Sequence, residues 1–328
     1  METQLAFTGR PYCGEPDLPR FAELINHIGT VENLDESTSP DELRQWFSSP
    51  SVDPQTNIRA WEDGDGRLVA LALVTTLAPT ETSSDGRLLY YIHPDVAQSG
   101  LDDEVITWGE GRLREHGAGL GLPCNLYSGA LESYTSKREA LERNGFTIAR
   151  YFFVMHRPLD EPLEVPQLPE GFTLSNVAEH PDIDRYVEMH NLAFIDHWGF
   201  HPLLPERRAH LLKDPQYKPE GGLLAIASDG TFAAYADCYI DAGHNERANK
   251  SEGWIGTLGT RRGYRKMGLG RAMLLAALHW LKSQGVQTGV LDVDAENPTG
   301  ALRLYESVGF HTVKTEVVYS KEVMSNED

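Results

Sequence analysis

The residues best suited to chemistry lie in one glycine-rich segment, RKMGLG, from Arg265 to Gly270. The segment stands between an expected strand and an expected helix. Glycines there allow backbone N–H groups to converge without obstruction by Cβ atoms, and a helix start adds the positive end of its dipole. Five cationic side chains surround the segment, in a chain of net charge −20: Arg261, Arg262, Arg265, Lys266 and Arg271. The pattern predicts a phosphate-binding turn, although a solvated basic turn remains the alternative.

Two common phosphate motifs do not fit this turn. A Walker loop needs a lysine and then a serine or threonine after its last glycine. Here Gly268 is followed by Leu269 and Gly270. A dinucleotide motif needs a small residue where Met273 stands and an acidic residue further along a βαβ unit. Neither nucleotide-binding class is therefore predicted.

Two longer stretches, TLGTRRGYRKMGLGRAMLLAAL and ENPTGALRLYESVGF, follow one another in the chain. Together they resemble the two signature motifs of the GNAT superfamily of acyl-CoA-dependent N-acyltransferases. The first resembles the R/Q-x-x-G-x-G/A pyrophosphate loop, and the second resembles the N-x-x-A-x-x-L-Y-x-x-x-G-F helix. The order of expected elements extends the resemblance over residues 171–320, and one departure is Arg262, where the family usually has proline.

The resemblance implies acetyl-CoA as co-substrate and no metal. In the family, the strand before the loop pairs with the pantetheine arm, the loop holds the pyrophosphate, and an asparagine on the next segment binds the pantetheine. Carried onto this sequence, these residues are Leu258, Gly259, Thr260, Arg265, Lys266, Met267, Gly268, Leu269, Gly270, Arg271 and Asn297.

The implied reaction is acyl transfer from a thioester to an amine, which needs an oxyanion donor, a base and a proton for the thiolate. Backbone N–H groups at a bulge at Gly259–Thr260 are expected to serve the oxyanion. Tyr305 matches the family tyrosine that protonates the thiolate, although it also fits a core position. The family position that often holds glutamate is Trp254 here, so Glu252, on the same strand face, is the candidate base. A solvated carboxylate, or no dedicated base, remains open.

Substrate contacts are expected from two places. Asp237 and Tyr239 alternate on the strand next to residues 253–260. Asp196, His197 and Trp198 follow the helix expected over 182–195, where acidic and aromatic groups suit a cationic or sugar-like amine. An ordinary helix end is the competing interpretation. His197 with His201 predicts no metal site, because no third ligand has matching spacing.

The proline-rich stretch 158–170 divides the chain into two expected domains, residues 1–157 and 171–328. Both halves show the same order of motifs, with Gly100 corresponding to Gly268, which indicates a duplication. The second half predicts a strand, helices, three strands, a helix, a strand, a helix and a strand. This is a mixed α/β fold built as two tandem GNAT-like domains, each with a mostly antiparallel sheet flanked by helices, and the pair resembles mycothiol-synthase-like proteins.

The first domain is expected to be a degenerate copy. Asp102 stands where the second half has Gly270, next to Asp103. Negative charge there repels a pyrophosphate. Leu141 replaces the tyrosine of the second half. Catalysis is therefore expected only in residues 171–328.

Composition limits the partners. The net charge of −20 disfavours nucleic acid and anionic membranes. No apolar run is long enough to span a bilayer. The cysteines, Cys13, Cys124 and Cys238, form no CxxC pair and fit a reducing cytoplasm. We expect an N-acetyltransferase of a small-molecule amine. A protein N-terminal or lysine acetyltransferase and a non-catalytic acyl-CoA-binding regulator remain alternatives.

Overall fold

The computed structural model describes residues 6–118, 120–214 and 216–323. The chain forms two compact units. The first unit comprises residues 1–150 and 316–328, and the second comprises residues 151–315.

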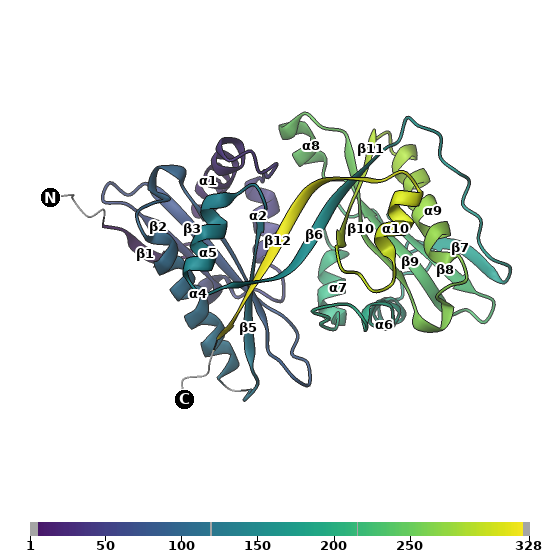
Figure 1. Cartoon of the computed structure of the whole chain (residues 1–328), viewed down its shortest axis with the longest axis horizontal. Helices are drawn as coiled ribbons and strands as arrows, with labels where there is room; N and C mark the ends of the chain where they lie inside the picture. The colour runs from purple at the N-terminus through teal and green to yellow at the C-terminus, as the bar shows by residue number, and fades with distance from the viewer. Residues whose placement is uncertain (1–5, 119, 215, 324–328) are drawn as a thin grey trace. The chain divides into compact units, whose positions relative to one another are not determined.

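The first unit begins with a strand, continues through helices and three further strands, and then alternates helix and strand (Figure 1). Its elements are β1 (Thr8–Pro11), α1 (Asp17–Val31), α2 (Pro40–Phe47), α3 (Pro54–Asn57), β2 (Ile58–Glu62), β3 (Leu68–Thr76), β4 (Gly86–Ile92), α4 (Leu101–Gly117), β5 (Cys124–Leu131), α5 (Thr135–Arg143) and the start of β6 (Thr147–Pro158).

The second unit repeats this order. Its elements are the remainder of β6, then β7 (Phe172–Asn176), α6 (Ile183–Phe194), α7 (Pro205–Leu211), β8 (Gly222–Ala227), β9 (Phe232–Tyr239), α8 (Ala242–Ala248), β10 (Glu252–Thr260), α9 (Leu269–Ser283), β11 (Thr288–Asp294), α10 (Ala301–Ser307) and the start of β12 (His311–Val323). The expected order of strands and helices is confirmed, and helix α8 is an addition that the sequence pattern did not reveal.

Both sheets are mixed and mostly antiparallel, as expected. In the second unit the strand order is β6-β11-β10-β9-β8-β7, and among these strands β10 and β11 run parallel. In the first unit the order is β1-β2-β3-β4-β5-β12, and β4 and β5 are the parallel pair. Each unit therefore places its parallel pair inside an antiparallel sheet.

The boundary between the units differs from the sequence-based division. The sheet of the second unit includes β6, whose residues 152–158 pair with β11. The sheet of the first unit includes residues 316–323 of β12, which pair with β5. Residues 159–170 of the proline-rich stretch contain no helix or strand, yet the compact units meet in the chain at Arg150 and Tyr151. Hydrogen bonding between strands, which local composition does not encode, decides where each unit ends.

Helices cover both faces of the sheet in the second unit. Helix α9 has nine fully buried residues and packs with β8, β9 and β10 in one hydrophobic core. Helix α6 packs on the opposite face, against Phe232 and Tyr235 of β9. Burial of these apolar stripes, at roughly 25 cal/mol per Å², holds the central strands rigidly between two layers.

The duplication is visible at the start of the corresponding helices. Gly268 precedes α9 with a φ of 92°, and Gly100 precedes α4 with a φ of 82°. Both values lie in the left-handed region that favours glycine. The two units thus share the same turn even though their loop sequences have diverged.

A turn that contains Pro298 precedes helix α10. The helix begins after Gly300, whose φ of 79° changes the chain direction. Among the described residues, no helix is both long enough and apolar enough to cross a membrane.

Candidate active site

The central feature of the second unit is a gap between strands β10 and β11. The two strands pair at only three positions, and the last pair is Trp254 with Val290. Beyond it, β11 stays paired with β6 as far as Asp294, while β10 stays paired with β9 as far as Thr260. The strands therefore diverge, and the edge of β10 after Trp254 offers unpaired peptide groups to an extended ligand.

A bulge lies in β10 at the point where this gap opens. The register of β10 on β9 shifts between Ile255 and Thr257, which leaves Gly256 as the extra residue. The expected bulge at Gly259–Thr260 is therefore wrong, because Gly259 and Thr260 pair regularly with Tyr235 and Ala234. A bulge frees one backbone group from the ladder. Here that group is next to the last β10–β11 pair.

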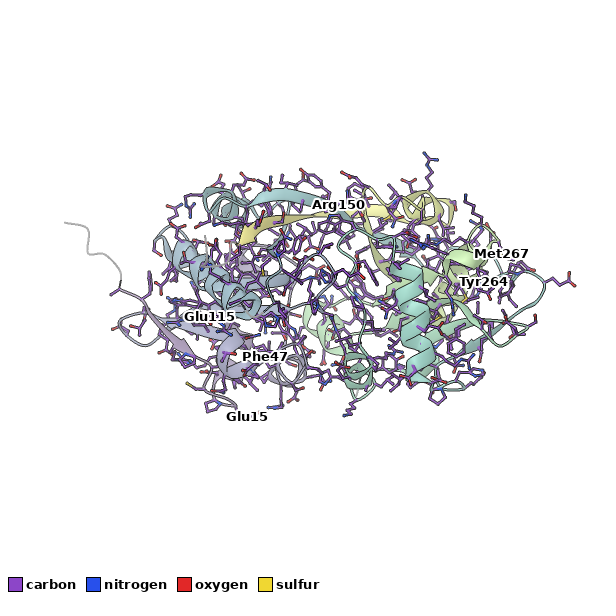
Figure 2. The ribbon with its side chains drawn as sticks, turned by 90° about the horizontal axis from the view of Figure 1, so that it is seen from below. Glu15, Phe47, Glu115, Arg150, Tyr264 and Met267 are labelled. Carbon is purple, nitrogen blue, oxygen red and sulfur yellow. The ribbon has the colours of Figure 1, made fainter. Side chains whose placement is uncertain are left out.

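The glycine-rich turn leads directly into helix α9. Lys266 has a φ of 64° and Gly268 a φ of 92°. These two left-handed residues turn the backbone N–H groups of the loop toward the same side as the start of α9. The helix start has no side-chain cap, and its first N–H groups are therefore available to an anion. Met267 is exposed near this turn (Figure 2), and Tyr264 anchors its start by packing against Phe172.

Most cations around the turn already have acidic partners. Arg262 and Arg265 both bind Asp196, and Arg265 also donates to the carbonyls of Thr260 and Ala193. These guanidinium groups hold the pKa of Asp196 well below its usual range. Arg265, predicted to bind phosphate, instead connects the turn to Thr260, Ala193 and Asp196. Asp196, predicted as a substrate contact, is instead an ion-pair partner of Arg262 and Arg265.

Lys266 is the exception. Its side chain is exposed, and no ion pair or hydrogen bond engages it within the described residues. Arg271 donates to Ser307 and Glu164 and so points toward α10 and the proline-rich stretch. Lys266 is thus the cation best placed to meet a bound phosphate.

Two predicted residues come from the segment after β11. The side-chain carbonyl of Asn297 accepts hydrogen bonds from the backbone and hydroxyl of Thr299, which fixes the turn and leaves its amide N–H groups for a ligand. Tyr305 lies on α10, 7% exposed, and burial raises the pKa of its hydroxyl. Within the described residues no hydrogen bond engages that hydroxyl, which stays protonated at neutral pH.

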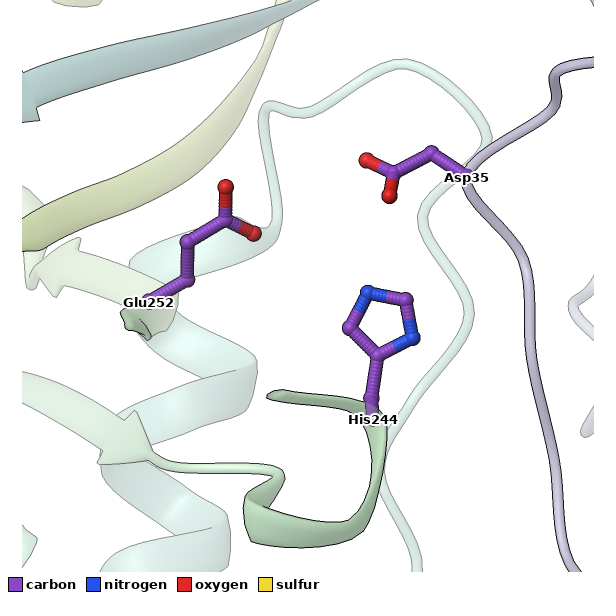
Figure 3. A group of neighbouring side chains, drawn as sticks. All are labelled: Asp35, His244 and Glu252. Carbon is purple, nitrogen blue, oxygen red and sulfur yellow. The ribbon is translucent and has the colours of Figure 1, made fainter. Parts of the chain in front are cut away.

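Glu252 lies at the closed end of the gap. It is buried and forms an ion pair of 3.2 Å with Lys250. Figure 3 shows it together with His244, which lies on α8 of the same unit; Asp35, also drawn, belongs to the first unit. An ion-paired carboxylate two residues before the gap opens is poorly placed to accept a proton inside it.

Asp292 is an acidic residue that sequence reasoning missed. It follows Val290 by two residues, so its side chain is on the same face as Trp254, while Leu291 and Val293 enter the core under α9. The residue as a whole is exposed, while loss of hydration around its carboxyl raises the pKa of that group. It also lies close enough to Tyr305 and Tyr239 to raise the pKa of both hydroxyls. The signal in the sequence was one acid in the middle of an apolar strand.

Tyr239 of β9 and Trp254 of β10 are paired neighbours beside the point where the gap opens. Their rings stack at 6.2 Å with an interplanar angle of 10°, and Tyr239 is 43% exposed. A side chain at Gly256 would meet the Tyr239 ring at 2.8 Å. Glycine at the bulge is therefore required, because a larger residue would collide with the Tyr239 ring and disturb its stacking on Trp254.

The carboxylate of Asp237 is held by hydrogen bonds and an ion pair to neighbouring side chains. It accepts hydrogen bonds from Tyr186 at 2.9 Å and from Arg208 at 2.8 Å. The Tyr217 hydroxyl accepts a hydrogen bond from Arg208 and donates one to Asp237, so it bridges the two charged groups. Arg208 is 2% exposed. Asp237 therefore neutralises a buried cation of α7, and it is not a free substrate or base group.

His197 and Trp198 follow α6 toward the far end of β11. The ring of Trp198 lies 6.4 Å from that of Phe152. Burial, and then the charge of Arg265, lower the pKa of His197, while Asp294 of β11 raises it. His197 thus lies near Asp294 of β11, and Trp198 near Phe152 of β6; their role as substrate contacts stays a prediction.

Comparison with known proteins gives consistent results. A family profile described as "Acetyltransferase (GNAT) family" matches residues 184–310. A mycothiol acetyltransferase of Thermobispora bispora is 32% identical over 272 residues, which are 79% of this chain and 81% of that protein. A mycothiol acetyltransferase of Thermomonospora curvata is 28% identical over 85% of this chain and 98% of that protein.

Solved structures show the same architecture. A GCN5-related N-acetyltransferase from Sphaerobacter thermophilus has a TM-score of 0.72 and 28% identity, and the match covers 98% of this chain and 97% of that chain. A tandem GNAT protein from the clavulanic acid biosynthesis pathway has a TM-score of 0.67 at 15% identity, covering 98% of this chain and all of that chain. The second likeness is one of fold.

Proposed function

Because the chain belongs to the GNAT acetyltransferase family, we propose that its second unit transfers the acetyl group of acetyl-CoA to a primary amine of a small molecule. The observation that carries the proposal is the gap between β10 and β11, which is open at the bulge of Gly256 and bordered by the turn at Gly268. An extended pantetheine arm fits against the unpaired edge of β10, and its diphosphate fits at the start of α9 beside Lys266.

The reaction follows from the groups at the open end of the gap. The amine nitrogen attacks the thioester carbon, a C–N bond forms, and the C–S bond breaks. Asp292 accepts the proton lost by the amine, since burial raises the pKa of its carboxyl above the ordinary value and a higher pKa makes the carboxylate a stronger base. Tyr305 gives its proton to the departing thiolate. Both groups lie at the same opening, so the two proton transfers need no large movement.

Two candidate bases can be separated by their pH profiles. We expect Asp292→Asn to lower kcat by about 10²–10⁴-fold and to remove the acidic limb of the kcat/KM profile. Glu252→Gln keeps that limb, because Glu252 is held by Lys250. If Glu252→Gln removes the limb and Asp292→Asn does not, Glu252 is the base.

The acceptor is tested with a panel of amines. Because the relatives are named mycothiol acetyltransferases, the acceptor of those enzymes is the first compound to test. Amino sugars, polyamines and peptides with a free N-terminus or lysine follow. Release of free CoA with a small amine supports the proposal. Turnover with peptides alone indicates a protein acetyltransferase, and binding of acetyl-CoA without turnover on any acceptor indicates a regulator. Either result contradicts the proposal.

The other expectations rest on sequence. We propose that the protein acts in the cytoplasm, takes acetyl-CoA as co-substrate without a metal, and uses neither nucleic acid nor a membrane as partner. The acidic surface implied by its net charge of −20 supports the exclusion of polyanionic partners.

A further inference from the structure

Three arginines at the start of the glycine-rich turn bind helix α6 or the residues just after it. Arg261 pairs with Glu188 of α6 at 3.2 Å. Arg262 and Arg265 both pair with Asp196, and the contact of Arg265 is 2.7 Å long. Asp196 lies two residues beyond the last residue of α6. These three cations therefore join the turn to α6.

Arg265 connects the end of α6 to the end of β10. Its guanidinium donates to the carbonyl of Ala193 at 2.8 Å and to the carbonyl of Thr260 at 3.1 Å. Ala193 lies in the last turn of α6, where carbonyls lack partners within the helix and a cation is favourable. The backbones are close here, because a Cβ atom at Gly259 would lie 3.1 Å from the Cβ of Ala193 and 2.8 Å from the Phe194 ring. A movement of the turn must therefore displace the end of α6 as well.

Arg262 stands where the family usually has proline, and its side chain pairs with Asp196 alone within the described part of the chain. Its Nε and Nη2 groups donate to the two carboxylate oxygens of Asp196, and a paired contact of this kind fixes geometry as well as charge. Arg262 begins the short turn Arg262–Tyr264, after Arg261 with a ψ of 145°. Proline is compatible with both features. The arginine is therefore needed for its side chain and not for its backbone.

Asp196 belongs to the segment 195–198, which the sequence assigned to acceptor contacts. The backbone N–H of His197 donates to the carbonyl of Phe194 at 2.8 Å, and the two rings lie 4.4 Å apart. Ile195 is 44% exposed, and the side chain of Asp196 is 30% exposed. Because burial holds these two residues only weakly, the ion pairs of Asp196 anchor this part of the segment to the turn.

We propose that Asp196 is a positioning residue, which couples occupancy of the glycine-rich turn to the order of residues 195–198. The inference rests on the proposed function, because it takes CoA as the ligand of the turn. A diphosphate bound to the N–H groups of the turn and to Lys266 fixes the turn. Arg262 and Arg265 then hold Asp196 in place. The acceptor meets a segment that is already ordered, and since coupling between two sites is reciprocal, an ordered segment favours cofactor binding in turn.

Hydrogen exchange of the backbone amides of residues 196–199 tests the coupling in the full chain, with and without saturating CoA. Calorimetry measures CoA binding separately. In the wild type we expect CoA to slow this exchange by at least about 5-fold. Asp196→Asn should still bind CoA, weakened by no more than about 5-fold, and should lose the slowing. Arg262→Pro, which leaves the Arg265 contact in place, should lose part of it, and this variant carries the test alone if Asp196→Asn does not fold.

Glu188→Gln is the matched control. It removes a carboxylate that α6 pairs with the neighbouring Arg261, about two helical turns before Asp196, and it should respond to CoA as the wild type does. A merely structural role for Asp196 predicts faster exchange in Asp196→Asn with the CoA-dependent slowing retained, and that result would overturn the coupling.

Three other results would also decide against the coupling. The first is a wild type that binds CoA without any slowing, which leaves the proposed function intact. The second is a folded Asp196→Asn protein that binds no CoA, because Asp196 would then belong to the cofactor site itself. The third is a wild type that binds no CoA, which contradicts the proposed function as well.

Discussion

Removal of one buried charge at the start of α4 should stabilise the first unit. Asp102 is 6% exposed, and its pKa is raised from 3.8 to about 6, chiefly by loss of hydration. Each pKa unit corresponds to about 1.36 kcal/mol, so ionisation of Asp102 at pH 7 costs the folded unit about 3 kcal/mol. Asparagine lacks the charge but forgoes a favourable helix-dipole interaction of about 0.3–1 kcal/mol. We therefore expect Asp102→Asn to raise the free energy of unfolding by about 2–3 kcal/mol at pH 7.

The sign of the pH dependence follows from the direction of the shift. Below pH 3.8 the carboxyl is neutral in the folded and the unfolded protein, so the wild type carries no penalty. As the pH rises through about 6 the folded form loses the proton that it held more tightly, and the wild type loses stability. The advantage of Asp102→Asn should therefore grow between about pH 4 and about pH 6 and stay constant above.

Native-state hydrogen exchange of α4 amides, corrected for intrinsic rates, measures this locally. Asp103→Asn is the matched control from the same turn. Asn144 and Arg143 lower the pKa of Asp103, so its replacement should give no gain at pH 7. An Asp102→Asn protein that is less stable than the wild type at pH 7, with a difference that does not change by pH 4, would refute the reasoning.

Three further predictions concern the second unit. Gly268→Glu should weaken acetyl-CoA binding at least about 100-fold by calorimetry, since Gly268 has a φ of 92° and a carboxylate there repels phosphate; unchanged affinity would exclude the turn as the phosphate site. Tyr305→Phe should lower kcat by about 10²–10⁴-fold with little change in CoA affinity, and a wild-type rate would remove its role as acid. Arg208→Met should lower the free energy of unfolding by about 3–5 kcal/mol in urea titrations, because it leaves Asp237 without its cation. The double variant with Asp237→Asn should recover part of that loss, and strict additivity would contradict the pairing.

The glycine-rich turn was the most predictable part of the candidate site. Glycines at fixed positions, a run of cations and a following apolar helix are all local features, and the structure places Gly268 at the helix start as expected. Tyr305 was likewise singled out by its match to the tyrosine of the GNAT helix motif, although its apolar stripe also fitted a core position. The roles of individual cations were not predictable, because Arg265 and Asp196 meet only after α6 and β10 pack together.

The bulge in β10 and the position of Asp292 show which features of the site the sequence could not predict. Three glycines in β10 marked a disturbed strand, but the position of the extra residue depends on its register with β9. Asp292 was one acid among apolar neighbours, and its proximity to Tyr305 and Tyr239 depends on the divergence of β11 from β10. Register and divergence are properties of strand pairs, and a single segment does not contain them.

The sequence by itself determined the order of strands and helices, the duplication, the glycine-rich turn and the family, because these depend on short-range spacing. Only the tertiary structure decided which acid faces the open gap, which cations already have partners, and which strand completes each sheet. These outcomes depend on contacts between residues far apart in the chain, where hydrogen bonds and ion pairs form only after the hydrophobic layers have fixed the strands in place.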